Sequence, residues 1–140
     1  MDPDEFLGPD PLVIKLTGKD PETVIDELIH HLVANHRIKA ADEEAIAFSV
    51  KKRESAMSTG IGYGIALPHA STDSGIEVVK IVGCSREGIP FAALDGKPVN
   101  IVILFLVPTG QFQRHTETLA DVAKLLHDRG FREGLRRRFL

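Results

Sequence analysis

The side chains of this 140-residue chain that could act as nucleophiles or proton carriers are six histidines and a single cysteine, Cys84. His69 has the most distinctive setting, because it follows Pro68 and ends a segment with glycine at every second position from residue 60 to residue 64. Proline fixes the backbone, and glycine lets main-chain N–H groups come close to an anion. The setting is typical of an anion-handling histidine, although taken alone it also fits a plain surface turn.

The remaining histidines and Cys84 have simpler interpretations. His30, His31 and His36 lie in or just after an expected helix, and His127 lies beside charged neighbours in another. These four positions favour solvated helix surfaces. Cys84 lies in an apolar run typical of a strand, where a cysteine usually packs as a small buried side chain.

Several well-known sites are excluded by their own spacing requirements. The segment 60–64 reads G-x-G-x-G, which is not the dinucleotide fingerprint G-x-G-x-x-G, and the segment 83–88 lacks the Lys-Ser/Thr pair of a P-loop. His115-Thr-Glu117 imitates part of a zinc deaminase motif, but the P-C-x-x-C partner is missing. The sequence therefore predicts no cofactor and no bound metal.

One longer pattern resembles a known family. Arg53-Glu54, followed by Ser58-Thr-Gly-Ile-Gly-Tyr-Gly-Ile-Ala-Leu-Pro-His69, resembles the active-site signature of the enzyme IIA proteins of the bacterial phosphotransferase system, in their fructose/mannitol/nitrogen class, the type-2 EIIA domain. The segments 85–91 and 94–99, and His115 with the helix after it, also fall where that family has its equivalents. The resemblance covers roughly residues 12 to 140.

Two features at the edges of this resemblance stand out. Tyr63 occupies a position where the family often has a polar residue such as Asn, and the chain stops at Leu140, earlier than many members. Residues 1–11 are acidic and rich in proline, so we expect them to form a flexible N-terminal tail.

The resemblance implies a role for each site residue. His69 would be the nucleophile that takes a phosphoryl group from a phosphorylated HPr-like carrier and passes it to a cysteine of enzyme IIB. Arg53 would neutralise charge on the phosphoryl oxygens, as a guanidinium does well. His115 would donate an N–H to the same group or orient His69. Glu54 either holds Arg53 in place or is a solvated carboxylate.

The resemblance leaves the biological role open between two functions. The chain could feed a sugar permease as a phosphocarrier. It could instead be a nitrogen-type regulatory module, in which phosphorylation of His69 changes the binding of regulatory proteins without sugar transport. A histidine metal site, a third possibility, lacks ligand spacing.

Composition limits the other classes of function. Lys and Arg number 17 against 20 Asp and Glu, so no strong basic field suggests a nucleic-acid partner. One cysteine excludes an internal disulfide framework and fits a reducing compartment. The longest apolar stretch, residues 99–108, is far shorter than the roughly 20 residues of a membrane helix, and the acidic start is unlike a signal peptide. We therefore expect a cytoplasmic protein without membrane insertion.

The elements that must position these residues can be read from caps and periodicity. Asp20 and Pro21 begin a helix that ends near residues 35–37, and Asp42 can cap a second helix that runs towards Arg53. A last long helix, with apolar residues at 119, 122, 123 and 126, is expected to stop at Gly130.

Three segments are expected to be strands, residues 12–16, 76–84 and 99–107, and the third is apolar enough to be central in a sheet. The predicted order is therefore β, α, α, β, β, α. It indicates an α/β (α+β-like) fold in a single domain, with a mixed parallel and antiparallel sheet flanked by helices on both faces.

Overall fold

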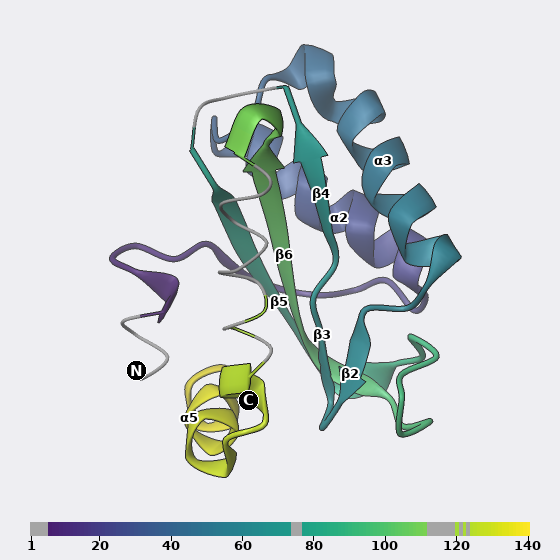
Figure 1. The fold of residues 1–140 in the computed structure, drawn as a ribbon, viewed down its shortest axis with the longest axis vertical. Coiled ribbons are helices and arrows are strands. Elements are labelled where there is room, and N and C mark those ends of the chain that lie inside the picture. The colour runs from purple at the N-terminus through teal and green to yellow at the C-terminus, as the bar shows by residue number, and fades with distance from the viewer. Residues whose placement is uncertain (1–5, 74–76, 112–119, 121, 123) are drawn as a thin grey trace.

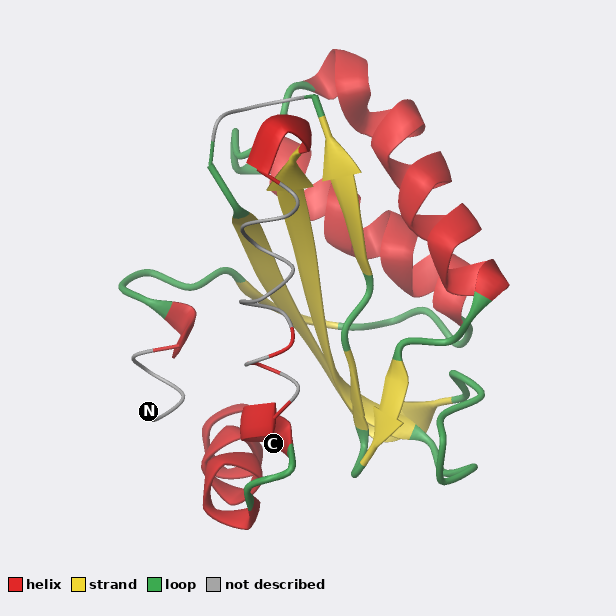
Figure 2. Cartoon of the chain, viewed as in Figure 1, coloured by secondary structure: helices red, strands yellow, loops and turns green. Residues whose placement is uncertain are grey.

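The computed structural model describes residues 6–73, 77–111, 120, 122 and 124–140, which form a mixed β-sheet with helices on both faces (Figure 1). The sheet has six strands in the order β1-β5-β6-β3-β2, and β4 also pairs with β6. This arrangement confirms the predicted fold class. Figure 2 shows the helices α2 and α3 on one side of the strands and α5 on the other.

The long strands β5 and β6 form the centre of the sheet. β5 (Val79–Ile89) and β6 (Val99–Pro108) pair antiparallel, and β1 (Val13–Lys15) adds to β5 in parallel. Nine of the ten residues of β6 are buried, which confirms the prediction of a central strand. β6 therefore provides the register against which the site residues can be placed.

Three short strands lie between α3 and β5, in a part of the chain where the sequence predicts no strand. β2 (Gly60–Gly62) pairs antiparallel with β3 (Ile65–Ala66), while β3 and β4 (His69–Thr72) both pair in parallel with β6. His69 lies opposite Phe105 in that register. The candidate nucleophile thus begins a strand.

The helices α2 (Pro21–Ala34) and α3 (Glu43–Ala56) pack together and cover one face of the sheet. The predicted cap of α2 is confirmed, because the Asp20 carboxylate accepts a hydrogen bond from the backbone N–H of Thr23 at 2.9 Å. Asp42 stands at the N-cap position of α3, as predicted, but its side chain makes no capping hydrogen bond. A 3₁₀ turn, η1 (Ala40–Asp42), leads into α3 instead.

The prediction for the last helix is wrong at Gly130. The helical residues that precede it end at Leu126, and a new helix, α5 (Arg129–Phe139), contains Gly130 as its second residue. The reason is a cap: the Asp128 carboxylate accepts a hydrogen bond from the N–H of Phe131 at 2.9 Å. Phe131 and Leu135, one turn apart, are buried against the second face of the sheet.

Phe6 and Leu7 belong to the same packed layer as α5. The Phe6 ring lies 6.0 Å from the Phe105 ring and 5.9 Å from the Phe131 ring, centroid to centroid. A flexible tail over residues 1–11 therefore does not describe these two residues, and the rest of that boundary stays a prediction. Within the described part of the chain, no helix combines the length and the apolar composition needed to cross a bilayer.

Candidate active site

His69 is half-buried at the start of β4, and one of its ring nitrogens is fixed. Nδ1 lies 2.9 Å from the backbone carbonyl oxygen of Leu67. A carbonyl oxygen only accepts, so Nδ1 carries the hydrogen and donates it. The lone pair of the neutral ring is then on Nε2, which is the nitrogen available for attack.

The backbone before His69 is held from both sides. The N–H of Leu67 donates to the carbonyl of Thr59 at 3.2 Å, and the carbonyl of Pro68 accepts from the N–H of Phe105 at 3.0 Å. Because the Leu67 carbonyl sits between these two anchors, the hydrogen bond that orients the imidazole is preorganised. The sequence gives no signal for this carbonyl, since its direction depends on the pairing with β6.

The alternation of side chains along β4 determines which side of the sheet His69 faces. Ala70 packs on the α2/α3 side, whereas Phe105, the register partner of His69, is buried in the cluster on the opposite side. Successive side chains in a strand point to opposite faces. His69 therefore faces the side of the sheet opposite α2 and α3.

The glycine-rich segment forms a tight hairpin, β2 to β3. A side chain on Gly60 would place its Cβ 2.8 Å from the Cβ of Ala93, so glycine allows the two backbone segments to lie close together. At the turn, Tyr63 has φ +59° and Gly64 has φ +78°. Asn tolerates this left-handed conformation better than Tyr, so the turn holds Tyr63 in a backbone conformation that suits a shorter polar residue.

The expectation that glycine N–H groups approach an anion gains no support from the contacts of this hairpin. The N–H of Gly60 donates to the Ser58 hydroxyl at 3.0 Å, and the N–H of Tyr63 donates to the Asp95 carboxylate at 3.1 Å. These two donors are used within the hairpin and its neighbours. Gly60 therefore serves close packing, and Gly64 serves the left-handed turn.

Arg53 is half-exposed in the last turn of α3, a helix that lies beside β4 (Figure 1). Its guanidinium donates through Nη1 to the carbonyl of Met57 at 2.9 Å. Among the described residues no hydrogen bond joins Arg53 to His69. Among the described strands β4 pairs with β6 alone, so the edge of β4 away from β6 is not covered by a described strand.

The surroundings of Glu54 match neither of the two roles that the sequence allows, a contact with Arg53 or a solvated carboxylate. It is 8% exposed, and its carboxylate accepts from the N–H of Thr59 at 2.6 Å and from the Thr59 hydroxyl at 2.5 Å. It is neither solvated nor bonded to Arg53. This buried pair ties the end of α3 to the start of the hairpin that leads to His69. Sequence reasoning missed it because a polar helix end does not reveal which carboxylate is buried.

The other two candidate positions have different outcomes. His115 lies outside the described residues, so its role stays a prediction. Cys84 is a buried free cysteine, and burial raises the pKa of its thiol from the ordinary 9.0 to about 11. A thiol of this kind is a poor nucleophile, in agreement with the predicted structural role.

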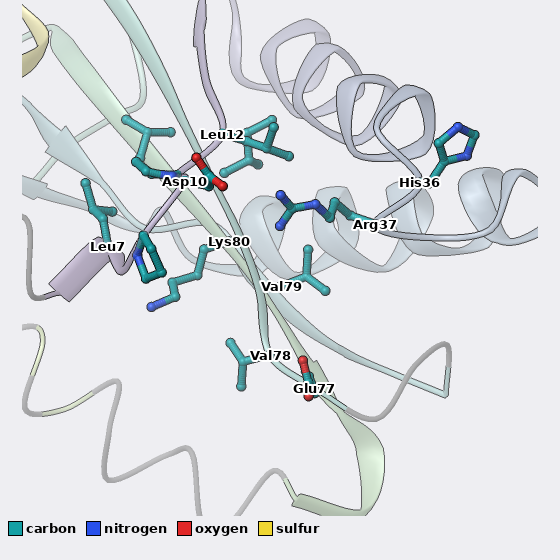
Figure 3. A pocket seen from close by; sticks show the side chains of 13 residues that line it. Leu7, Asp10, Leu12, His36, Arg37, Glu77, Val78, Val79 and Lys80 are labelled. Carbon is teal, nitrogen blue, oxygen red and sulfur yellow. The ribbon is translucent and has the colours of Figure 1, made fainter.

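A separate cleft runs along β5 on the N-terminal side of the molecule, and Figure 3 shows Asp10, Arg37, Glu77 and Lys80 around it. The Lys80 ammonium donates to the carbonyl of Phe6 at 2.9 Å, and burial lowers the pKa of this lysine. His69 is not among the residues that line the cleft. The cleft along β5 is therefore distinct from the candidate active site.

Known proteins resemble this chain along nearly its whole length. Residues 5–138 match the family model described as "Phosphoenolpyruvate-dependent sugar phosphotransferase system, EIIA 2". The match spans nearly the whole chain and includes His69. The chain belongs to this family of phosphotransferase-system enzyme IIA domains.

Individual relatives fall into a sugar class and a regulatory class. The chain is 35% identical over 136 residues to the PTS system fructose-specific EIIABC component of Bacillus subtilis, covering 97% of this chain and 20% of that protein. It is 30% identical over 133 residues to a nitrogen regulatory protein of Pseudomonas aeruginosa, covering 95% of this chain and 85% of that protein.

A solved structure shows the same fold. The crystal structure of nitrogen regulatory protein IIA-Ntr from Neisseria meningitidis superposes with a TM-score of 0.76 at 27% identity, covering 89% of this chain and 83% of that one. The chain thus spans most of the nitrogen regulatory proteins but only a fifth of the Bacillus protein.

Proposed function

We propose that this protein is a phosphocarrier whose His69 accepts a phosphoryl group from a phosphorylated HPr-like protein and passes it to a second protein. The hydrogen bond from Nδ1 to the Leu67 carbonyl carries the proposal, because it leaves the Nε2 lone pair free for attack. As the bond from Nε2 to phosphorus forms, the bond from phosphorus to the donor breaks. In the second step an enzyme IIB thiolate attacks, and the Nε2–P bond breaks as the S–P bond forms.

Two further residues support the transferred group in this proposal. Arg53 supplies positive charge to the equatorial oxygens, for which its guanidinium leaves the Met57 carbonyl and turns round the edge of β4. His115 donates an N–H to the phosphoryl group or orients His69. The reaction uses no metal or cofactor and takes place in the cytoplasm.

The acceptor distinguishes two forms of this function. The fructose-specific relative favours an enzyme IIB cysteine as acceptor and sugar uptake as the outcome. The nitrogen regulatory relatives, which the chain matches over most of their length, favour the alternative, a regulatory protein whose binding depends on the phosphorylation of His69. Rapid transfer of the phosphoryl group to a purified fructose-class enzyme IIB supports the first form. Retention of the group, with phosphorylation-dependent binding of a regulator, supports the second.

The test of the phosphocarrier function is phosphorylation of His69. Incubation with enzyme I, HPr and labelled phosphoenolpyruvate is expected to add one acid-labile phosphoryl group to the wild type and none to His69→Ala. His31→Ala, which alters an exposed histidine on α2, is the matched control and should be labelled like the wild type. Labelling of His69→Ala at the wild-type level would show that the nucleophile is another residue.

A further inference from the structure

Three neighbouring strands place a row of side chains on the face of the sheet that carries His69. His69 of β4 lies opposite Phe105 of β6, and Phe105 lies opposite Lys80 of β5. Residues that face each other across neighbouring strands point to the same side of a sheet. With strands about 4.8 Å apart, Phe105 is the immediate neighbour of His69, and Lys80 follows at about 10 Å. Whatever holds Phe105 therefore acts on the space beside the imidazole.

The space next to Phe105 is filled by a residue from the start of the chain, Phe6. The Phe6 ring lies 6.0 Å from the Phe105 ring and 5.9 Å from the Phe131 ring of α5, centroid to centroid. The two pairs are tilted and edge-on, as aromatic rings in contact prefer to be. Both Phe6 and Phe105 are buried. Phe6 therefore closes the space between β6 and α5 in which the Phe105 ring lies.

A polar contact from the same row fixes the position of Phe6. The Lys80 ammonium donates to the Phe6 carbonyl at 2.9 Å and lies 5.2 Å from the centroid of the Phe6 ring. Figure 3 shows the Lys80 side chain directed towards the segment that carries Leu7. A half-buried ammonium needs a hydrogen-bond acceptor, which the Phe6 carbonyl supplies. Lys80 therefore anchors the backbone of Phe6 as well as its ring.

We propose that Phe6 is a positioning residue for phosphoryl transfer, an inference that rests on the proposed function of His69. Phe6 keeps the Phe105 side chain in place, and Phe105 limits how far the imidazole can pivot about its hydrogen bond to the Leu67 carbonyl. Nε2 then keeps one direction for attack on phosphorus. Because core side chains interlock at high density, neighbours take up a space opened at Phe6, and Phe105 is the neighbour that adjoins His69.

Neither Phe6 nor Lys80 takes part in a chemical step. Both act on the geometry of His69 before the carrier arrives, so their effect is expected in the unphosphorylated protein as well as in the transfer rate. A displacement of a reacting group by about 1 Å can slow a reaction roughly 10²-fold. A partial relaxation of Phe105 should cost less, and we expect about a 10-fold effect.

The test measures the His69 ring and the transfer rate in the same variants of the full chain. In Phe6→Ala, the ¹⁵N signals of the imidazole are expected to broaden and to move away from those of a ring with its hydrogen on Nδ1. Quench-flow transfer from phosphorylated HPr should slow by about 10-fold. Phe6→Leu refills most of the space and should recover most of both readouts.

A second variant removes the anchor of Phe6 and leaves its ring. Lys80→Met loses the hydrogen bond to the Phe6 carbonyl but keeps an apolar stem of similar length. It should change the ring signals and the rate in the same direction as Phe6→Ala, by a smaller amount. Lys80→Met also preserves the test if Phe6→Ala fails to fold.

The matched control is Leu28→Ala, because Leu28 is fully buried in the layer formed by α2 and α3 on the opposite face of the sheet. Its loss also destabilises the protein, but well below the unfolding transition it should keep the wild-type ring signals and rate. A wild type that takes no phosphoryl group would refute the proposed function, whereas the ring signals test Phe6 without any donor.

Three results would overturn the positioning role of Phe6. The first is a set of wild-type ring signals together with a wild-type rate in Phe6→Ala. The second is an equal change in Leu28→Ala, which would reflect a general loss of stability. The third is slower transfer in Phe6→Ala with unchanged ring signals, which would mean that Phe6 acts on the carrier and not through the imidazole.

Discussion

His69 and Cys84 are two potential nucleophiles on the same face of one sheet, and they differ in exposure and in protonation. Both flank β6, His69 opposite Phe105 and Cys84 opposite Ile101. The imidazole is half-exposed and donates from Nδ1, whereas the thiol is buried and its pKa is raised to about 11. Reactivity is therefore decided by access and protonation, which the residue type alone does not reveal.

The two regions also differ in how they connect to the rest of the chain. The segment before His69 is linked to α3 through Glu54 and Thr59 and to β6 through Pro68. Cys84 is surrounded by apolar side chains and contributes packing. If this contrast is correct, changes around His69 should alter the transfer rate, and changes at Cys84 should alter stability only.

The largest effect is expected at Arg53. Arg53→Met should slow transfer from phosphorylated HPr by about 10²-fold to 10³-fold, because the positive charge that the proposed function assigns to the phosphoryl oxygens is lost. Arg53→Lys keeps the charge without the planar fork and should lose less. Quench-flow rates measure both. Lys52→Met, which alters the exposed neighbour of Arg53, is the control. A wild-type rate in Arg53→Met would show that Arg53 has no part in transfer and serves only its hydrogen bond to the Met57 carbonyl.

A smaller effect is expected at Glu54. Glu54→Ala leaves the N–H and the hydroxyl of Thr59 without their acceptor in a buried site, which should lower the free energy of unfolding by about 2 kcal/mol. Because the hairpin that leads to His69 then loses its tie to α3, transfer should also slow by about 10-fold. In the presence of Glu54, Thr59→Ser keeps both hydrogen bonds and should transfer at the wild-type rate. Urea unfolding and quench-flow rates provide the two measurements.

The control for Glu54 is another glutamate of the same helix. Glu44 is exposed in the first turn of α3, and Glu44→Ala should change neither quantity by a comparable amount. A destabilised Glu54→Ala variant that transfers at the wild-type rate, measured well below its unfolding transition, would show that the tie is structural and does not position the site.

The success of sequence-based prediction also differs between regions. Local signals locate α2, α3, β5 and β6, because Asp20, Pro21 and long apolar runs act within a few residues. The strands β2 to β4 have two to four residues each and exist only through pairing with β6 and with each other, which glycine-rich composition does not reveal. At Gly130 a local signal was available, since Asp128 precedes Phe131 and Leu135 at cap and one-turn spacing.

The site shows the same division. The motif that ends at Pro68-His69 can be recognised along the sequence, so His69 is predicted from it. The Leu67 carbonyl that fixes the imidazole and the buried carboxylate of Glu54 depend on contacts between elements. Burial decides whether a carboxylate is solvated or structural, and no pattern within residues 53–59 encodes it.

The smallest effect is expected at Cys84, and it should appear in stability at high pH. The folded-state pKa of about 11 lies above the ordinary 9.0, so the neutral thiol contributes stability that is fully present below pH 9 and is lost as the pH rises towards 11. Over this range the free energy of unfolding of the wild type should fall by about 2 kcal/mol more than that of Cys84→Ala. Chemical denaturation at pH 8, 9, 10 and 11 gives the difference. Equal pH dependence in the two proteins would mean that the thiol ionises as freely in the folded state as in the unfolded one. Cys84 would then be a second candidate nucleophile beside His69.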